Sequence, residues 1–356
     1  MTTKAGRATA ATNAAHASQS GGMPDSPGNG MWMHSLREWM GAWREGVVRF
    51  FLEPSSAETL ALIRMATGAM IVYIHAVWLW DREMFFGPDA LVDLETLRAI
   101  NARSHRWTYL ALTDSLGLAT AHEWLALLAG ASLSIGFATR WVAPLAWFLT
   151  LMTVHRLIPF LFGLDQITLM LSMYLIVGRS GSVWSLDAML ARRCTQRGIN
   201  ASWVRWLGWS DDGRPCWSNT VATRLIQLHL CAIYLFGGLG KLRGWMWWDG
   251  SALWFAAASY EYQSLDLTWI GRYPWLASAA THATLFWELM YVALVWPRLT
   301  RPLVLAMALC VHGGIAIYMG MITFGVMMIV ANLAFLSPAL VRSWVPSRPN
   351  TCHPPI

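Results

Sequence analysis

Lysine is almost absent from this chain. Its 26 basic residues are 24 arginines and two lysines, Lys4 and Lys241, and Lys241 ends a long apolar stretch. An arginine keeps its proton at every accessible pH, whereas a lysine in apolar surroundings can release its proton and act as a base. Lys241 is therefore a candidate for acid–base chemistry. The alternative is a lysine whose ammonium group reaches the membrane interface and does no chemistry.

Two later apolar stretches contain further ionisable residues. His282 and Glu288 lie in one of them, and His312 lies in the next. If these stretches are successive membrane helices, both histidines come near the depth of Lys241, and Glu288 lies about 9 Å deeper than His282. A lysine, two histidines and a glutamate near one level would form a proton-handling site. For either histidine alone, the alternative is a hydrogen bond to a backbone carbonyl.

Other charged residues in apolar stretches are expected to be structural. Arg64 and Asp165 are predicted to form buried ion pairs, either with each other or with Arg224 and Glu288. Such pairs would neutralise charges that are costly at membrane depth.

The sequence has no pattern typical of a metal or soluble cofactor. Its cysteines and histidines lack the spacing of a metal site, so no metal is expected, and His75 and His229 are interpreted as core histidines. A phosphate-binding loop and a dinucleotide fingerprint are also absent.

The composition indicates a membrane protein. The chain has 356 residues, of which 56% are hydrophobic and 13% charged, and its mean hydropathy is +0.40. A soluble domain would carry about 25% charged residues. The apolar residues form blocks long enough, or nearly so, to cross a hydrocarbon core of about 30 Å. The tryptophans cluster at the block edges, as interfacial anchors do. A soluble enzyme, a nucleic-acid-binding protein and a disordered scaffold are excluded.

The apolar blocks predict an all-α bundle of about eight transmembrane helices, between two tails. Residues 1–33 are expected to be a disordered cytosolic tail, residues 34–52 an amphipathic interfacial helix, and residues 341–356 a short cytosolic tail. The predicted spans are 58–80, 121–138, 141–160, 165–178, 221–241, 275–296, 302–319 and 322–337, where only Gly320 separates the last two.

The distribution of positive charge predicts the orientation. With the N-terminus inside, 16 basic residues are cytosolic and 8 are external, and the other two lie within spans. This bias places both termini in the cytosol. The connections 81–120 and 242–274 then face outward, and the chain is expected to be a multi-pass protein of the plasma (inner) membrane.

Short motifs follow one another in a fixed order through the apolar region. They are Ile63–Gly68, Gly163 with Asp165, Trp184–Asp187, Tyr234–Leu242, Trp248–Gly250 with Ala252–Trp254, His282, and His312 followed by Phe324. In this order they resemble the horizontally transferred transmembrane (HTTM) domain, which vitamin K-dependent γ-carboxylases share with many bacterial membrane proteins. The resemblance covers about residues 55–340.

The resemblance implies an outward-facing cavity that binds a reduced quinone of the vitamin K or menaquinol type. In the carboxylases, a lysine at the position of Lys241 is the base, and the resemblance implies that His282 and His312 assist it. Three residues are expected to contact the quinone: Tyr234, Trp248 and Glu288. Three others are expected to be structural: Arg64, Asp165 and Gly238.

The chain also departs from the animal carboxylases. They have two adjacent lysines where this chain has Gly240 and Lys241, and they continue into a C-terminal β-rich domain that binds the protein substrate. We expect this chain to be an integral membrane protein without that domain.

Two functions follow from these expectations. The first is a γ-carboxylase-like enzyme, a quinol-dependent carboxylase or oxygenase, with Lys241 as its base. The alternative is a non-enzymatic accessory protein for the maturation of, or immunity to, a secreted peptide. The expected partners are the lipid bilayer and a secreted peptide or protein substrate. A transporter is disfavoured because no inverted repeat is visible.

Overall fold

The computed structural model describes residues 28–199, 201–209 and 213–345, and every regular element in these ranges is a helix. The chain divides into two units, Met1–Val48 and Arg49–Ile356. The predicted all-α fold is confirmed for the described residues. Residues 1–27 of the predicted N-terminal tail and residues 346–356 of the predicted C-terminal tail lie outside them.

In the first unit, helix α1 (Gly28–Leu52) includes the predicted interfacial helix 34–52 and begins earlier, at Gly28. Four large apolar side chains recur on it at spacings of three and four residues, and all are exposed: Leu36, Trp39, Met40 and Trp43. This spacing places them on one face of the helix. Such an exposed apolar face is typical of a helix that lies on a membrane surface.

In the second unit, each predicted span coincides with a helix. These helices are α2 (Glu58–Trp80), α5 (Leu116–Ile135), α6 (Thr139–Arg156), α7 (Gly163–Leu175), α10 (Trp217–Lys241), α13 (Pro274–Leu294), α14 (Arg301–Tyr318) and α15 (Ile322–Asn332). Within the described residues, four helices are long and apolar enough to cross a membrane: α2, α5, α10 and α14. The predicted break at Gly320 is confirmed, since this glycine has a φ of +67° between α14 and α15.

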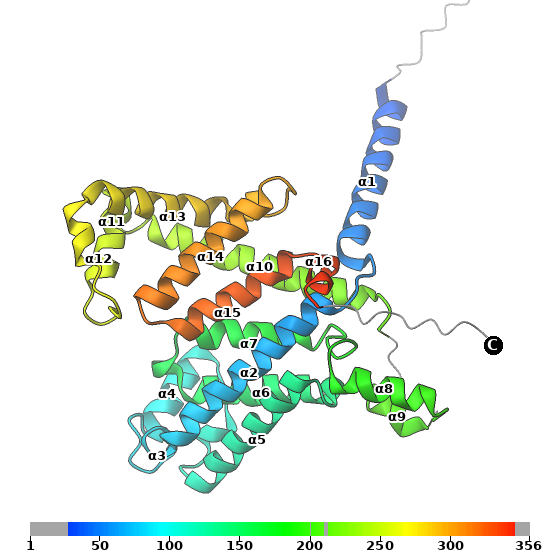
Figure 1. Ribbon diagram of the computed structural model, residues 1–356, viewed down its shortest axis with the longest axis horizontal. Coiled ribbons are helices and arrows are strands. Elements are labelled where there is room, and N and C mark those ends of the chain that lie inside the picture. Colours follow the sequence, from blue (N-terminus) through cyan, green and yellow to red (C-terminus); the bar gives the residue numbers. More distant parts are fainter. Residues whose placement is uncertain (1–27, 200, 210–212, 346–356) are drawn as a thin grey trace, which may run out of the picture. The chain divides into compact units, whose positions relative to one another are not determined.

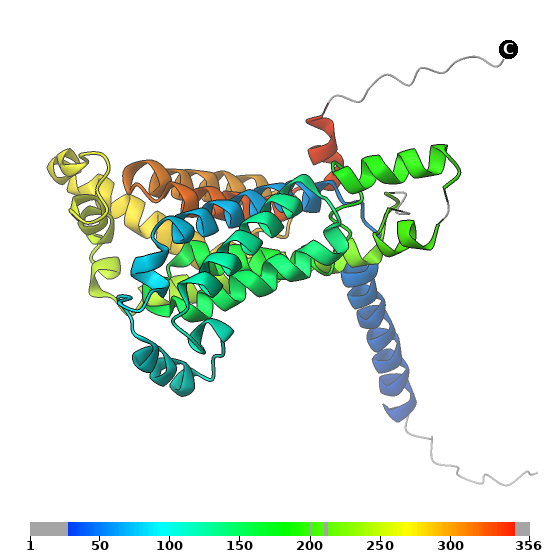
Figure 2. The same cartoon turned by 90° about the horizontal axis from the view of Figure 1, so that it is seen from below.

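The connecting segments of the second unit gather at two opposite ends of its long helices (Figures 1 and 2). Helices α3 (Arg82–Phe86), α4 (Leu94–Ser104), α11 (Trp245–Trp248) and α12 (Ala252–Ala258) lie toward one end. Helices α8 (Leu186–Gln196), α9 (Ser202–Trp206) and α16 (Pro338–Ser343) lie toward the other. The connections 81–120 and 242–274 therefore share an end, as predicted.

Many large apolar side chains on the outside of the second unit are exposed. Examples are Phe236 on α10, Phe286 on α13 and Leu303 on α14, which are 71%, 62% and 74% exposed. Exposed apolar surface over long helices is typical of contact with lipid. Trp80 and Trp248 lie at helix ends and are also exposed, as expected for interfacial anchors.

Helices α2 and α5 make a close antiparallel contact through small residues. A Cβ atom added to Gly68 would overlap backbone atoms of Gly130 and Ser134, so the two backbones nearly touch. The Ser134 hydroxyl also donates to the Met65 carbonyl at 2.9 Å. Glycines at helix contacts allow this close approach in membranes.

Helices α10 and α13 approach each other in a similar way. A Cβ atom on Gly238 would meet the Leu289 side chain at 2.9 Å. A side chain at position 238 would therefore collide with Leu289, and the role expected for Gly238 is the structural one of allowing this contact.

Candidate functional site

Lys241 and Glu288 form an ion pair between helices α10 and α13. The Lys241 Nζ atom is 2.9 Å from Glu288 Oε1 and 2.7 Å from Oε2. The Lys241 side chain is 28% exposed and that of Glu288 is 11% exposed. The Trp247 ring adds a cation–π contact, with its centroid 5.3 Å from Nζ. The pair can therefore be reached from outside the bundle although its carboxylate is nearly buried.

Gly237 lies directly beside this ion pair. A Cβ atom there would lie 3.7 Å from Glu288 Oε2 and 3.9 Å from Lys241 Nζ, which are ordinary contact distances. Gly237 is one turn before Lys241 on the same face of α10. A side chain at position 237 would therefore contact both charged groups, and glycine leaves them uncovered on this side.

A second polar group connects four helices through His312. The Tyr234 hydroxyl is 2.7 Å from His312 Nε2 and accepts a 2.9 Å hydrogen bond from Asn332 Nδ2. The Tyr291 hydroxyl donates to Asn332 Oδ1 at 2.6 Å. The Tyr234 oxygen accepts from Asn332, and its own proton would find an acceptor if it is donated to His312 Nε2.

This arrangement assigns the ring proton of His312 to Nδ1. His312 is buried, and among the described residues Nδ1 has no hydrogen-bond partner. An unpaired buried donor costs about 1–3 kcal/mol. A ligand oxygen that accepts a hydrogen bond from His312 Nδ1–H would therefore be stabilised here.

The two polar groups share one face of α10. Tyr234 and Lys241 are seven residues apart, which corresponds to two turns, or about 10 Å along the helix. Their partners Glu288 and Tyr291 are three residues apart on α13 and also face the same way.

His282 is not part of either group. Its Nδ1 lies 2.9 Å from the Ser278 carbonyl and 3.4 Å from the Ser278 hydroxyl, and its Nε2 lies 3.3 Å from the Trp248 carbonyl. The Trp248 indole donates to the Leu242 carbonyl at 2.8 Å. Beside His282, a pocket of about 530 Å³ is lined in part by Trp254, Trp275 and Ser278.

The predicted ion pairs of Arg64 and Asp165 are wrong. Arg64 is completely buried and donates to four backbone carbonyls: Leu133 at 2.6 Å, Ser134 at 2.7 Å, Trp184 at 2.8 Å and Ser180 at 3.1 Å. Two of these carbonyls are at the end of α5, where helix carbonyls lack partners within the helix.

Asp165 and Arg224 also bind nearby polar groups instead of each other. The Asp165 carboxylate accepts from the Phe162 amide at 3.1 Å and so caps α7. Arg224 donates to the Phe50 carbonyl at 3.0 Å and to Gln227 at 2.8 Å. Hydrogen bonds to backbone groups and to the Gln227 side chain thus stabilise the charged Asp165 and Arg224 side chains, whereas Glu288 pairs with Lys241.

The Trp184–Asp187 motif has a structural role next to Arg64. The Asp187 carboxylate accepts from the backbone amides of Ala138 and Thr139, each at 2.8 Å, and from the Trp209 indole at 2.7 Å. It therefore caps the start of α6, while the Trp184 carbonyl binds Arg64.

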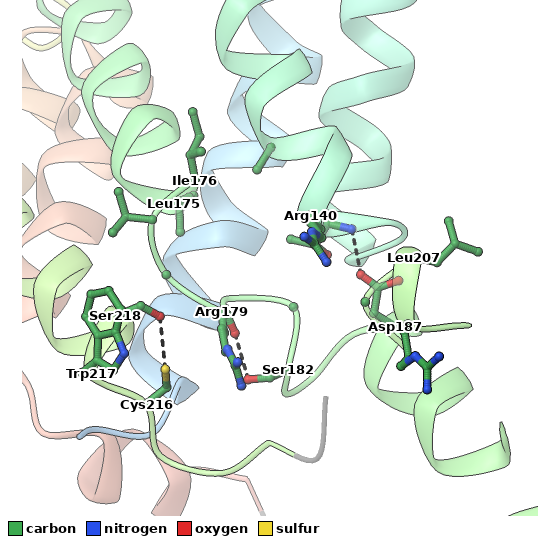
Figure 3. Close-up of a pocket in the computed structure, with 17 residues that line it drawn as sticks. Arg140, Leu175, Ile176, Arg179, Ser182, Asp187, Leu207, Cys216, Trp217 and Ser218 are labelled. Atoms are coloured by element: carbon green, nitrogen blue, oxygen red, sulfur yellow. Dashed lines mark hydrogen bonds between the residues drawn. The ribbon is translucent and has the colours of Figure 1, made fainter. Parts of the chain in front are cut away.

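Figure 3 shows a pocket at this same end of the bundle, with a volume of about 630 Å³. Its lining includes Arg140, Arg179, Asp187 and Cys216. It contains none of the predicted catalytic or quinone-binding residues.

A buried polar cluster that was not predicted from the sequence lies between α2, α5 and α6. His75, which was interpreted as a core histidine, contacts Glu123 through Nδ1 and Oε2 at 2.6 Å. His122 lies beside Glu123, with its Nε2 atom 3.7 Å from Oε1. The sequence feature that could have indicated this cluster is the adjacent pair His122 and Glu123 at the start of an apolar stretch.

Comparisons with known proteins add no relative: the chain matches no family model, no curated protein and no solved structure.

Proposed function

We propose that this chain is an HTTM-type membrane enzyme that binds a reduced quinone and transfers protons at Lys241 and Glu288. The observation that carries this proposal is the partly exposed Lys241–Glu288 ion pair, against which Gly237 places no side chain. An ion pair between membrane helices is costly unless it has a function or excellent pairing. This one remains partly exposed, so a ligand can approach it.

The residues of the site suit a quinol. When bound, the quinol supplies a hydroxyl proton and the reducing equivalents. Lys241 and Glu288 share one proton: while it is on Lys241, the Glu288 carboxylate can accept a second proton, and after it has passed to Glu288, the Lys241 amine can accept one. The unmet N–H of His312 would donate to a quinone oxygen, and Tyr234 positions the His312 ring.

We further propose that all eight helices that coincide with predicted spans cross the membrane. Four are long and apolar enough by themselves. Helix α7 has only 13 residues and α15 only 11, or about 20 and 16 Å at 1.5 Å per residue. Both contribute buried side chains to the main hydrophobic cluster.

Reporter fusions test this topology. A reporter that is active only in the cytosol should work when fused after Ile356, and an external reporter should work within residues 260–265, because positive charge favours this orientation. Cytosolic activity at the second position would put Lys241 on the wrong side of the membrane and contradict the proposal.

Co-purified lipids test the quinone site directly. Lipids extracted from protein purified in mild detergent should contain a quinone, measured by mass spectrometry per mole of protein. We expect Gly237→Leu to lower the amount of bound quinone by about tenfold or more. The added side chain would occupy the place beside Lys241 and Glu288 where the quinone would bind.

Gly240→Leu is the matched control, since a Cβ atom at Gly240 meets nothing within 4 Å. It should keep the wild-type amount of quinone. Equal amounts in both variants would contradict binding at this place. A complete lack of quinone in the wild type would instead favour the accessory protein as the function.

A further inference from the structure

We propose that His75, His122 and Glu123 form a buried site for one divalent transition-metal ion. The ligand atoms of these three residues all lie within 4.8 Å of one another. Two histidines and one glutamate are a known ligand set for zinc and suit other first-row metals. This site is separate from the proposed quinone site.

The inner nitrogen of each histidine faces the carboxylate. His75 Nδ1 is 2.6 Å from Glu123 Oε2, and His122 Nε2 is 3.7 Å from Oε1. The side chains of His75 and Glu123 are 0% exposed and that of His122 is 1% exposed. Metal–ligand bonds of about 2.0–2.2 Å need only small side-chain movements from these positions.

The outer nitrogen of each histidine is bound by a hydroxyl. His75 Nε2 lies 3.2 Å from Thr150 Oγ1, and His122 Nδ1 lies 2.5 Å from the Tyr109 hydroxyl. A partner on the outer nitrogen fixes the ring orientation and the tautomer, and metal-binding histidines almost always have one. With metal bound, hydrogen bonds from His75 Nε2–H and His122 Nδ1–H to these oxygens would leave both inner nitrogens as ligands, and the metal would replace the 2.7 Å contact of His122 Nε2 with the Thr153 hydroxyl.

Thr153 completes the surroundings of the site. Its hydroxyl is 2.7 Å from His122 Nε2 and donates to Glu123 Oε1 at 3.1 Å. It therefore lies where it can hydrogen-bond a fourth metal ligand, such as water. A metal site with three protein ligands keeps this kind of open position.

The charge of the cluster also calls for a cation. The hydrogen bonds to Glu123 in the described structure come from His75 and Thr153, and neither an arginine nor a lysine is among its partners. A buried carboxylate is costly unless a positive charge compensates it, and in the metal-free cluster a proton shared with His75 can do so. A metal ion would supply this charge and displace the proton between His75 Nδ1 and Glu123 Oε2 to solvent.

Metal loading of the full-length protein tests the proposal. The protein is purified in mild detergent with a tag that contains no histidines, stripped with a chelator, and incubated with Zn²⁺ or Co²⁺. After desalting, elemental mass spectrometry should give about one metal ion per chain. The Co²⁺ form should show visible absorption bands of a histidine-ligated site, and metal should raise the unfolding temperature.

Variants locate the metal. His122→Asn and Glu123→Gln should lose the bound metal and the Co²⁺ bands. Thr150→Val keeps all three ligands, so it should fold normally and weaken metal affinity about 10–100-fold. His229→Asn is the matched control, because His229 also pairs with a tyrosine hydroxyl, that of Tyr174 at 2.9 Å, and lies outside the cluster; it should bind metal like the wild type.

Two results would overturn the proposal. The first is a wild-type protein that binds no metal after loading, which would mean that the cluster holds a shared proton instead. The second is metal bound equally by the wild type, His122→Asn and Glu123→Gln, which would place the ion elsewhere. Both measurements are independent of any catalytic activity.

Discussion

Lys241→Arg is expected to lower quinol-dependent oxygen consumption about 10²–10⁴-fold, the usual contribution of a general base. The structure makes this substitution a sharp test. An arginine keeps the positive charge and can still bind the Glu288 carboxylate, so the ion pair and the contact between α10 and α13 survive. Only the ability to release a proton is lost. Oxygen uptake with an added reduced quinone, with the unfolding temperature measured in parallel, separates the two effects.

Two further substitutions define what the Lys241 result means. Glu288→Gln keeps hydrogen-bonding atoms near Lys241 but removes the proton acceptor, so it should also lower activity. Arg243→Gln removes a positive charge from the same end of α10 at an exposed position outside the ion pair, and should leave activity unchanged. Full activity in Lys241→Arg would end the catalytic interpretation, and Lys241 would be a structural partner of Glu288.

Arg64→Ala is expected to destabilise the second unit by about 3–5 kcal/mol, because it removes the donors of four buried carbonyls at about 1 kcal/mol each. Arg64→Lys should recover only part of this loss, since an ammonium group has three donors and lacks the planar fork of the guanidinium. Unfolding in detergent, followed by circular dichroism during a denaturant titration, measures the change.

Arg82→Ala is the control for Arg64. Arg82 is the first residue of α3, just after α2, and its side chain donates one hydrogen bond, to the Leu79 carbonyl at 3.2 Å. Its loss should cost about 1 kcal/mol. A similar small effect of Arg64→Ala would show that water or neighbouring groups replace the guanidinium, and that Arg64 does not hold the helix ends together.

Hydropathy was sufficient to locate the long apolar helices of the second unit. Each predicted span has a helix at the same place, because a run of apolar residues long enough to enter a membrane must satisfy its backbone internally. Side-chain pairing could not be predicted in the same way. Arg64 and Asp165 were expected to pair because both are charged and buried, but the free carbonyls and amides at helix ends are not visible in hydropathy, and those groups bind them.

The candidate site was predicted in part. Lys241 and Glu288 do meet, since a lysine side chain is long enough to reach a deeper carboxylate. His282 does not join them, because depth in the membrane says nothing about the direction in which a helix face points. His75 and Glu123 are 48 residues apart in the chain, and only the packing of α2 against α5 brings them together. Neither residue has a spacing that could have revealed this contact.

The glycine contact between α2 and α5 has a mechanical consequence for the buried histidines. His75 is seven residues after Gly68, and Glu123 is seven residues before Gly130. On antiparallel helices, both therefore lie two turns, or about 10 Å, beyond the contact on the same side. The two helices cross at this contact, so the distance between His75 and Glu123 depends on the angle at which α2 and α5 cross. A single methyl group at Gly68 or Gly130 would push the two helices apart and separate the residues of the cluster. Two residues without side chains therefore set the geometry of this polar part of the bundle interior.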